Sequence, residues 1–256
     1  MLSILYRMKV SRSSAKYLVT VLALFVVLGA YSALQLSKSR TFQLFGDVTA
    51  RIETTRKVVA LTLDDAPTDN TDDVLGVLRS KDIKATFYVI GESGRARPDV
   101  LKRIVSAGHE LGNHSFTHQR FLLTSPSFVR DEIESTNQVI RDAGYSGEIT
   151  FRPPYGKKLV ALPWYLSRHN IKTIMFDVEP DTYHPRHAGL LKQYTLDNVK
   201  PGSIILLHPL CGTDCSAARD ALPGIIDALR GEGYAFVTVG ELLRYDHAGA
   251  KANLGR

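Results

Sequence analysis

The sequence is poor in cysteine, and its 256 residues contain no internal repeat, low-complexity tract or second composition regime. The absence of a compositional boundary favours one folded domain. Its two cysteines, Cys211 and Cys215, are a weak zinc signature because no second pair accompanies them. We expect them to form a disulfide if they lie outside the cytoplasm, closing a small loop that adds less than about 3 kcal/mol of stability.

The first 40 residues lack acidic side chains, although they hold six of the 32 basic ones. Those six account for the formal net charge of +6, because the remaining 26 Lys and Arg balance the 26 Asp and Glu. The rest of the chain is therefore neutral overall. A general phosphate-binding face is not supported, and we predict no nucleic-acid partner.

The longest apolar run covers residues 17–36 and is almost uninterrupted. At about 1.5 Å per residue, a helix of this length spans roughly 30 Å, enough to cross a bilayer. Basic residues precede it, so the positive-inside rule places residues 1–16 in the cytoplasm and predicts a single-pass membrane anchor. A signal peptide cleaved near Ala30 and Ser32 is the alternative, which would make the protein secreted. Both interpretations place the folded domain outside the cytoplasm, in the periplasm or the extracellular space.

After a connection at residues 37–57, strand-like and helical patterns alternate as far as residue 245, and a tail covers residues 246–256. Strand-like runs lie at 58–63, 84–90, 148–151, 171–176, 203–207 and 235–239. Helical periodicity lies at 71–80, 98–107, 126–143, 157–170 and 217–231. The alternation predicts an α/β domain over residues 58–245, with a parallel sheet that is either open or closed into a barrel.

The apolar run 58–63 leads directly into Asp64 and Asp65, followed by Ala66 and Pro67. A run of this kind, ended by turn-forming residues, is typical of a strand buried on both faces. Its end would present both carboxylates at the rim of the sheet, where α/β folds usually carry active groups. Adjacent carboxylates repel, so a metal ion or an arginine would be needed beside them. The competing interpretation is a solvated turn with an Asp capping the next helix.

His114 and His118 are four residues apart, a spacing that places both imidazoles on one face of a helical turn. Together with Asp64 or Asp65 they would form the ligand set of a hydrolytic zinc site with an open coordination position. Buried structural histidines are the alternative interpretation of this pair. His109, just before them, is predicted to be structural.

Five segments, taken in order, resemble the motifs of the polysaccharide deacetylases, also called NodB-homology proteins or family 4 carbohydrate esterases. They lie at 61–67, 114–118, 151–156, 177–183 and 206–209. The resemblance covers most of the chain after the apolar run, and five ordered motifs are more specific than any single one. It implies a distorted (β/α) barrel of about seven parallel strands. It also implies one divalent metal ion, most simply zinc, and removal of N-acetyl groups from a glycan.

The family pattern implies a role for each matched residue. Asp64 is the general base, while Asp65, His114 and His118 hold the metal, because a ligated carboxylate is spent as a ligand and its neighbour stays free to accept a proton. Arg152 would neutralise Asp64, and Tyr155 would present its main-chain N–H to the oxyanion. His208 would protonate the leaving amine, and Leu206 would line the pocket for the acetyl methyl.

Two positions depart from the family pattern. Ala66 follows the Asp pair where the family usually has Gly, and residues 179–183 read Glu-Pro-Asp-Thr-Tyr where the fourth motif usually reads Asp-x-x-Asp-Trp. We therefore assign Glu179 to orient and tune His208, with Asp177 as its rival. His184 and His187 are predicted to face solvent.

The substrate class is open among peptidoglycan, a chitin-like oligomer and a polyglucosamine. Trp164, with Tyr155 and Tyr183, is a candidate for stacking on a sugar ring, although Trp164 could instead belong to the core. Two other functions are considered: a carbohydrate-binding pseudoenzyme, and a hydrolase of another amide or ester on the same barrel. The complete set of ligands and acid–base candidates argues against the pseudoenzyme.

Overall fold

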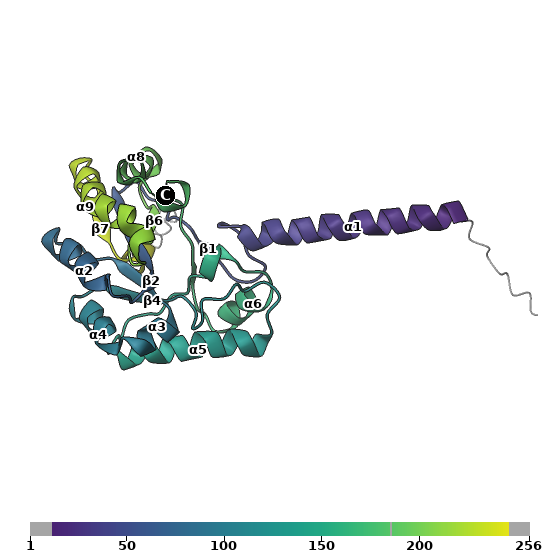
Figure 1. The fold of residues 1–256 in the computed structure, drawn as a ribbon, viewed down its shortest axis with the longest axis horizontal. Coiled ribbons are helices and arrows are strands. Elements are labelled where there is room, and N and C mark those ends of the chain that lie inside the picture. The colour runs from purple at the N-terminus through teal and green to yellow at the C-terminus, as the bar shows by residue number, and fades with distance from the viewer. Residues whose placement is uncertain (1–11, 185, 246–256) are drawn as a thin grey trace, which may run out of the picture.

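A computed structural model of the chain describes residues 12–184 and 186–245. Most of the predicted cytoplasmic segment and the whole predicted tail lie outside these residues. In the described part, helices surround a central group of strands, and one long helix, α1 (Arg12–Lys38), extends away from the body as a single rod (Figure 1). α1 includes the whole apolar run at residues 17–36.

The stretch Lys16–Lys38 of α1 is long and apolar enough to cross a membrane. Its large apolar side chains are exposed all round the helix, because nothing in the described chain packs against them; Phe25, for example, is 72% exposed. A helix of this length that is hydrophobic on every side and has no protein neighbour is typical of a segment made for a bilayer. An anchor and a signal sequence both fit this description.

The strands are organised around β2 (Val58–Ala66), which pairs in parallel with β3 (Thr86–Val89), β6 (Ile204–Leu207) and β7 (Ala235–Val237). β4 (Glu110–Asn113) extends this sheet beyond β3, and β1 (Val48–Thr49) pairs with β5 (Thr173–Ile174) in a second one. Single bridges through Phe151 connect β4 with β5. The fold is thus α/β with parallel strands, in two sheets joined by isolated bridges rather than in one continuous ladder of seven strands.

Five helices follow the predicted periodicities closely: α2 (Thr71–Ser80), α4 (Pro98–Ser106), α5 (Pro126–Asp142), α6 (Ala161–Arg168) and α9 (Ser216–Gly231). The pattern misses three helices, α3 (Gly91–Ala96), α7 (Pro180–Tyr183) and α8 (Ala188–Asn198), together with β1 and β4. The first two helices are short, and β4 has no β-branched residue. The predicted strand at 148–151 forms only the bridges at Phe151.

β2 is buried on both faces, as the apolar run predicts. Val59, Leu61 and Leu63 pack outward with α2 and α9, whereas Ala60 packs inward with Tyr88 and Leu206. This alternation follows from the two-residue period of a strand. Because β2, β4 and β6 are parallel strands of one sheet, in the order β4-β3-β2-β6, the residues that follow each of them lie at the same edge.

The connection at residues 37–57 is docked on the domain at this edge. The Lys158 N–H donates to the Ser37 carbonyl, and the Lys158 ammonium donates to the Ser39 carbonyl. Gln43 donates to the Thr173 hydroxyl at 3.2 Å, and Arg40 forms an ion pair with Glu179. These contacts hold the end of α1 close to the site described below.

Candidate active site

A cavity of about 480 Å³ opens at the carboxyl ends of β2, β4 and β6. It is lined by nearly every residue that the sequence marks for chemistry, including Asp64, Asp65, His114, His118 and His208. Of the six non-glycine residues with positive φ in the described part of the chain, four lie at or beside this cavity: Asp65, Ser115, His118 and Tyr155. Backbone in such conformations is costly and concentrates at functional sites, so the local geometry supports a site here.

Asp64 is buried and compensated by a buried arginine. The Arg152 guanidinium donates to Asp64 Oδ1 at 2.7 Å and to the Thr62 hydroxyl at 2.8 Å, and it lies 4.1 Å from the centre of the Tyr88 ring. Burial alone would raise the pKa of Asp64, but the charge and hydrogen bond of Arg152, together with the charges of His114 and His208, outweigh burial and lower the pKa below its usual value. Asp64 is therefore ionised at neutral pH.

Asp65 adopts the left-handed conformation, with a φ of 66°, at the end of β2. Its Oδ1 atom is buried and has no hydrogen-bond partner. Two imidazole nitrogens lie close to it, His118 Nε2 at 3.3 Å and His114 Nε2 at 3.8 Å. The adjacent carboxylates thus have different surroundings. Asp64 is neutralised by Arg152 and also lies 3.5 Å from His114 Nε2, whereas Asp65 has imidazoles beside it and no arginine ion pair in the described chain.

The two histidines lie in a loop after β4, and the predicted helical turn is wrong. Left-handed conformations at Ser115 and His118 turn the chain so that the two rings come within 5.0 Å of each other, measured between their centres. Buried Glu132 of α5 holds the loop by accepting from the N–H groups of Phe116 and Thr117, at 2.8 and 2.9 Å. Spacing identified the pair, but buried hydrogen bonds rather than helical periodicity bring the rings together.

The donor atoms of Asp65, His114 and His118 lie within 4.8 Å of one another, and their chemistry fits a divalent ion. His114 Nδ1 lies 2.7 Å from the Arg152 carbonyl oxygen, which can only accept, so Nδ1 carries the proton. A ring with its one proton on Nδ1 presents the Nε2 lone pair to the space between the two carboxylates, 3.5 Å from Asp64 Oδ2 and 3.8 Å from the unpartnered Asp65 Oδ1. Lone pairs converging in a buried space need a cation between them, and a backbone partner on the other ring nitrogen is typical of metal-binding histidines.

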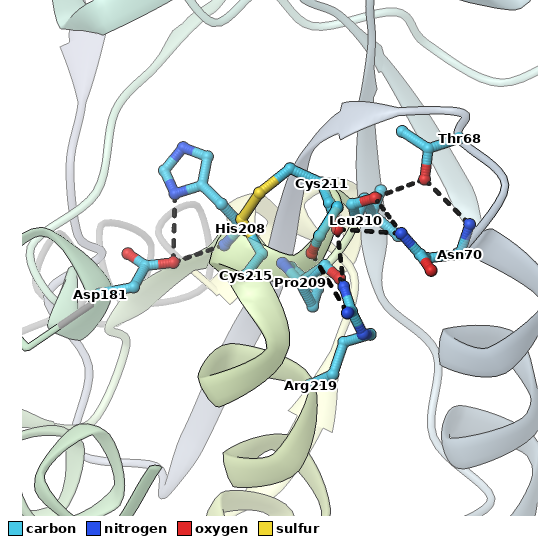
Figure 2. Close-up of a disulfide and its surroundings, with 10 residues drawn as sticks. Thr68, Asn70, Asp181, His208, Pro209, Leu210, Cys211, Cys215 and Arg219 are labelled. Carbon is cyan, nitrogen blue, oxygen red and sulfur yellow. Dashed lines mark hydrogen bonds and ion pairs between the residues drawn. A yellow bond between two sulfur atoms is a disulfide. The ribbon is translucent and has the colours of Figure 1, made fainter. Parts of the chain in front are cut away.

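His208 lies on another side of the same cavity, beyond the end of β6, and is paired with Asp181. Asp181 Oδ2 accepts from the His208 backbone N–H at 2.6 Å and lies 3.1 Å from the ring Nδ1 (Figure 2). Burial disfavours the charged ring, but the hydrogen bond and charge of Asp181 raise the pKa of His208 to about 9. With Nδ1 held by the carboxylate, Nε2 is the nitrogen left to exchange a proton with a substrate.

The predicted partners of His208 are therefore corrected. Glu179 forms its ion pair with Arg40, because its position at the start of α7 points it towards the connection. Asp177 accepts from the Ser203 hydroxyl and the Ile204 N–H, at 2.8 and 2.9 Å, and so braces the start of β6. The one-turn helix α7 carries Asp181 to the ring instead. Asp181 was not identified from the sequence; the signal that could have done so is its spacing from Asp177, Asp-x-x-x-Asp, after the strand-like run 171–176.

A disulfide joins Cys211 and Cys215 in the loop that follows His208 (Figure 2). The same loop is tied to both of its neighbours. Arg219 of α9 donates to the Cys211 carbonyl at 2.6 Å, and Asn70, in the turn after β2, donates to it at 2.9 Å. These bonds connect the segment that carries the acid candidate with the segment that follows the two aspartates.

The remaining predicted residues divide between the cavity and the rest of the fold. Leu206 and Tyr155 line the cavity, and the Tyr155 ring lies 4.7 Å from the His118 ring. Trp164, on α6, is not among the cavity-lining residues, and its contact with a sugar stays a prediction. His109 is structural as predicted: it is buried, its Nδ1 accepts from the Ala85 N–H, and burial lowers its pKa to about 4. His187 is exposed, as predicted, whereas His184 is half-buried beside Tyr194.

Comparison with known proteins agrees with the geometry. The sequence model of polysaccharide deacetylases matches residues 51–174. A peptidoglycan-N-acetylglucosamine deacetylase of Bacillus cereus is 32% identical over 205 residues, covering 79% of this chain and 95% of that protein. The corresponding enzyme PgdA of Listeria monocytogenes is also 32% identical, but the match covers only 41% of its length. This chain therefore spans well under half of that larger relative.

Solved structures give the same result. A peptidoglycan N-acetylglucosamine deacetylase in complex with a hydroxamate-type benzamide superposes with a TM-score of 0.71 at 31% identity, covering 75% of this chain and 91% of that one. The peptidoglycan deacetylase PdaC of Bacillus subtilis gives 0.70 at 28% identity, covering 79% and 98%. A CE4 family pseudoenzyme of Bacillus anthracis gives 0.69 at 30% identity, covering 76% and 68%. Likeness of fold therefore extends to a protein described as lacking activity.

Proposed function

The chain belongs to the polysaccharide deacetylase family, and from this premise we propose that it is a metal-dependent hydrolase that removes N-acetyl groups from a glycan outside the cytoplasm. The observation that carries the proposal is the convergence of three groups on one cavity: the ligand set, the Asp64–Arg152 pair and the Asp181–His208 pair. Each supplies a different requirement of amide hydrolysis.

Asp65, His114 and His118 would hold one divalent ion, most simply zinc, since two imidazoles and a carboxylate are a usual zinc set. When bound, the ion supplies a Lewis acid and lowers the pKa of a water molecule. Asp64 would accept the proton that the attacking water loses, because Arg152 keeps this carboxylate ionised. The Tyr155 main-chain N–H would donate to the acetyl oxygen as negative charge develops on it.

His208 would complete the reaction from the other side of the cavity. An amine is a poor leaving group, so the C–N bond breaks only if the nitrogen gains a proton as it departs. With a pKa of about 9, His208 is protonated at neutral pH and can supply that proton from Nε2. Leu206, which is 2% exposed, would contact the acetyl methyl as the bond breaks to acetate and the free amino sugar.

The relatives that act on peptidoglycan make it the first substrate to test, beside chitin-like and polyglucosamine oligomers. The test is acetate release by the full chain in detergent, measured on this panel with added zinc and again with a chelator. Release from at least one glycan that stops with chelator supports the proposal. Glycan binding with no acetate release in the presence of zinc would instead favour a carbohydrate-binding pseudoenzyme. Acetate release from simple esters alone would favour a hydrolase of another amide or ester.

A further inference from the structure

The cavity has a basic rim that the proposed reaction does not use. Lys38, from the end of α1, and Lys157, from the loop after the Pro-Pro-Tyr segment, both line the cavity that holds the candidate catalytic residues. Arg120 lies beside them, with its guanidinium 4.3 Å from the centre of the Tyr155 ring. We call Lys38, Arg120 and Lys157 the basic rim.

No ion pair involves any of the three among residues 12–184 and 186–245. They also repel one another: together with partial burial, the charges of Lys38 and Arg120 lower the pKa of Lys157 below its ordinary value. The acidic residues of the same wall are already committed. Asp64 is paired with Arg152, Glu179 is paired with Arg40, and Asp65 belongs to the candidate ligand set.

The rim is held in place rather than carried on a free tail. Lys38 lies between Ser37 and Ser39, whose carbonyls both accept from Lys158, and Ser37 is 1% exposed. Two residues further on, Arg40 is fixed by Glu179 and by the Phe176 ring 4.2 Å away. Lys157 immediately precedes buried Lys158 and follows the segment that places Tyr155. Convergent, anchored positive charges that form no ion pair within the described chain are suited to an anion.

We propose that the basic rim binds an anionic group, a carboxylate or a phosphate, carried by the glycan beside the sugar that loses its acetyl group. This assignment of substrate class rests on the proposed function. A glycan group is favoured over the headgroup of a membrane lipid because Lys38 and Lys157 face the same cavity as Asp64 and His208. An anion bound there would be close enough to the reacting amide for both groups to belong to one glycan chain.

Binding separates this proposal from the question of catalysis. The full chain in neutral detergent with zinc is titrated with three soluble oligomers of equal length. The first is a neutral oligomer of N-acetylglucosamine, the second alternates N-acetylglucosamine with N-acetylmuramic acid, and the third is an N-acetylglucosamine oligomer with a terminal phosphate. The Lys38→Gln/Lys157→Gln double variant is compared with Lys192→Gln, an exposed lysine on α8 outside the cavity wall. We expect the parent to prefer at least one anionic oligomer by about 5- to 10-fold, as two partly exposed charge pairs would provide.

The double variant should lose this preference while binding the neutral oligomer like the parent, and Lys192→Gln should keep it. Raising the salt concentration should erode the preference in the parent. The carboxylate and phosphate arms identify which anion is taken.

Equal affinity of parent and double variant for every oligomer would overturn the proposal, as would an equal loss for neutral and anionic ones. If the double variant binds every oligomer like the parent and loses only its binding to vesicles of anionic lipid, the rim belongs to the membrane and the glycan assignment is wrong. Because binding and acetate release are measured separately, a parent that binds but releases no acetate would refute the proposed function alone.

Discussion

His114 and His208 face one cavity and each lies near a carboxylate, yet the partner of Nδ1 differs between them. In His114 that nitrogen lies 2.7 Å from a backbone carbonyl, which leaves Nε2 as a lone-pair donor. In His208 it lies 3.1 Å from the Asp181 carboxylate, which favours the protonated ring. The same side chain is thus prepared to hold a cation in one place and to give a proton in the other.

The two aspartates at the end of β2 show the same division. Asp64 is compensated internally by Arg152, so it stays ionised without any ion. Asp65 Oδ1 is buried with no hydrogen-bond partner. One half of the cavity, formed by Asp65, His114 and His118, is therefore suited to an ion. The other elements, Asp64 and the Asp181–His208 pair, are suited to moving protons.

Removing the ion-holding half should give the largest effect. Asp65→Asn, or treatment of the parent with chelator, should lower acetate release by more than about 10³-fold, because the Lewis acid and the acidified water are lost together. Metal content is measured on the same samples and should fall from about one ion per chain. Zinc should restore the chelated parent but not the variant. Full activity in the metal-free parent would remove the distinction between the two halves.

Asp64→Asn should cost about 10²- to 10⁴-fold in turnover, because the amide cannot accept the proton of the attacking water. Metal content should stay at the parent level, since Asp64 is not in the candidate ligand set. Circular dichroism serves as the folding control, because the change leaves the Arg152 charge buried with a neutral partner. Loss of the ion together with activity would place Asp64 in the ligand set.

Asp181→Asn tests the proton-donating half through pH. A raised pKa means that His208 keeps its proton at neutral pH and that the rate falls as pH rises through about 9. Without the carboxylate, the pKa should return towards its ordinary value of about 6.5, so the alkaline limb of the rate profile should move to lower pH. Glu179→Gln is the matched control and should keep the parent's limb. An unshifted limb in Asp181→Asn would disprove the assignment of Asp181 as the residue that positions and tunes His208.

The smallest effect is expected from Cys211→Ser/Cys215→Ser. The bridge closes a loop with a sequence separation of 4, and the chain-entropy relation gives about 2 kcal/mol for a loop this short. Guanidinium unfolding of the full chain should show a loss of this size in the free energy of unfolding. The affinity for zinc should not change, because the bridged loop follows His208 and contains none of the candidate ligands. A weaker ion site would show that the loop supports both halves.

Local patterns predicted the parts of the fold that rest on local chemistry. The apolar run 58–63 and the amphipathic periodicity of α2 and α5 identify elements whose own side chains determine their burial. β4 was not predicted, because Glu110-Leu-Gly-Asn has no strand preference of its own and is held by pairing with β3. The shape of the His114–His118 loop was not predicted for a similar reason, since Glu132, 14 residues beyond His118, fixes it.

Most candidate site residues could be identified from the sequence because each belongs to one of the ordered motifs. The error lay in the fourth motif, where Glu179 was assigned with Asp177 as its rival and Asp181 was not considered. That choice depends on which carboxylate a four-residue helix turns towards β6, and on Arg40, 139 residues away in the chain, taking up Glu179. Contacts between the connection and the domain leave no periodic trace in a single sequence. The basic rim was missed for the same reason.

Zinc titration of three proteins tests the division between the two halves most directly. The parent, His114→Ala and His208→Ala, each as the full chain in detergent, are titrated by calorimetry at the same pH. The account predicts one ion per chain for the parent and for His208→Ala, with affinities within about threefold, and a loss of at least about 100-fold for His114→Ala. Equal weakening by both changes, or an undisturbed site in His114→Ala, would contradict it.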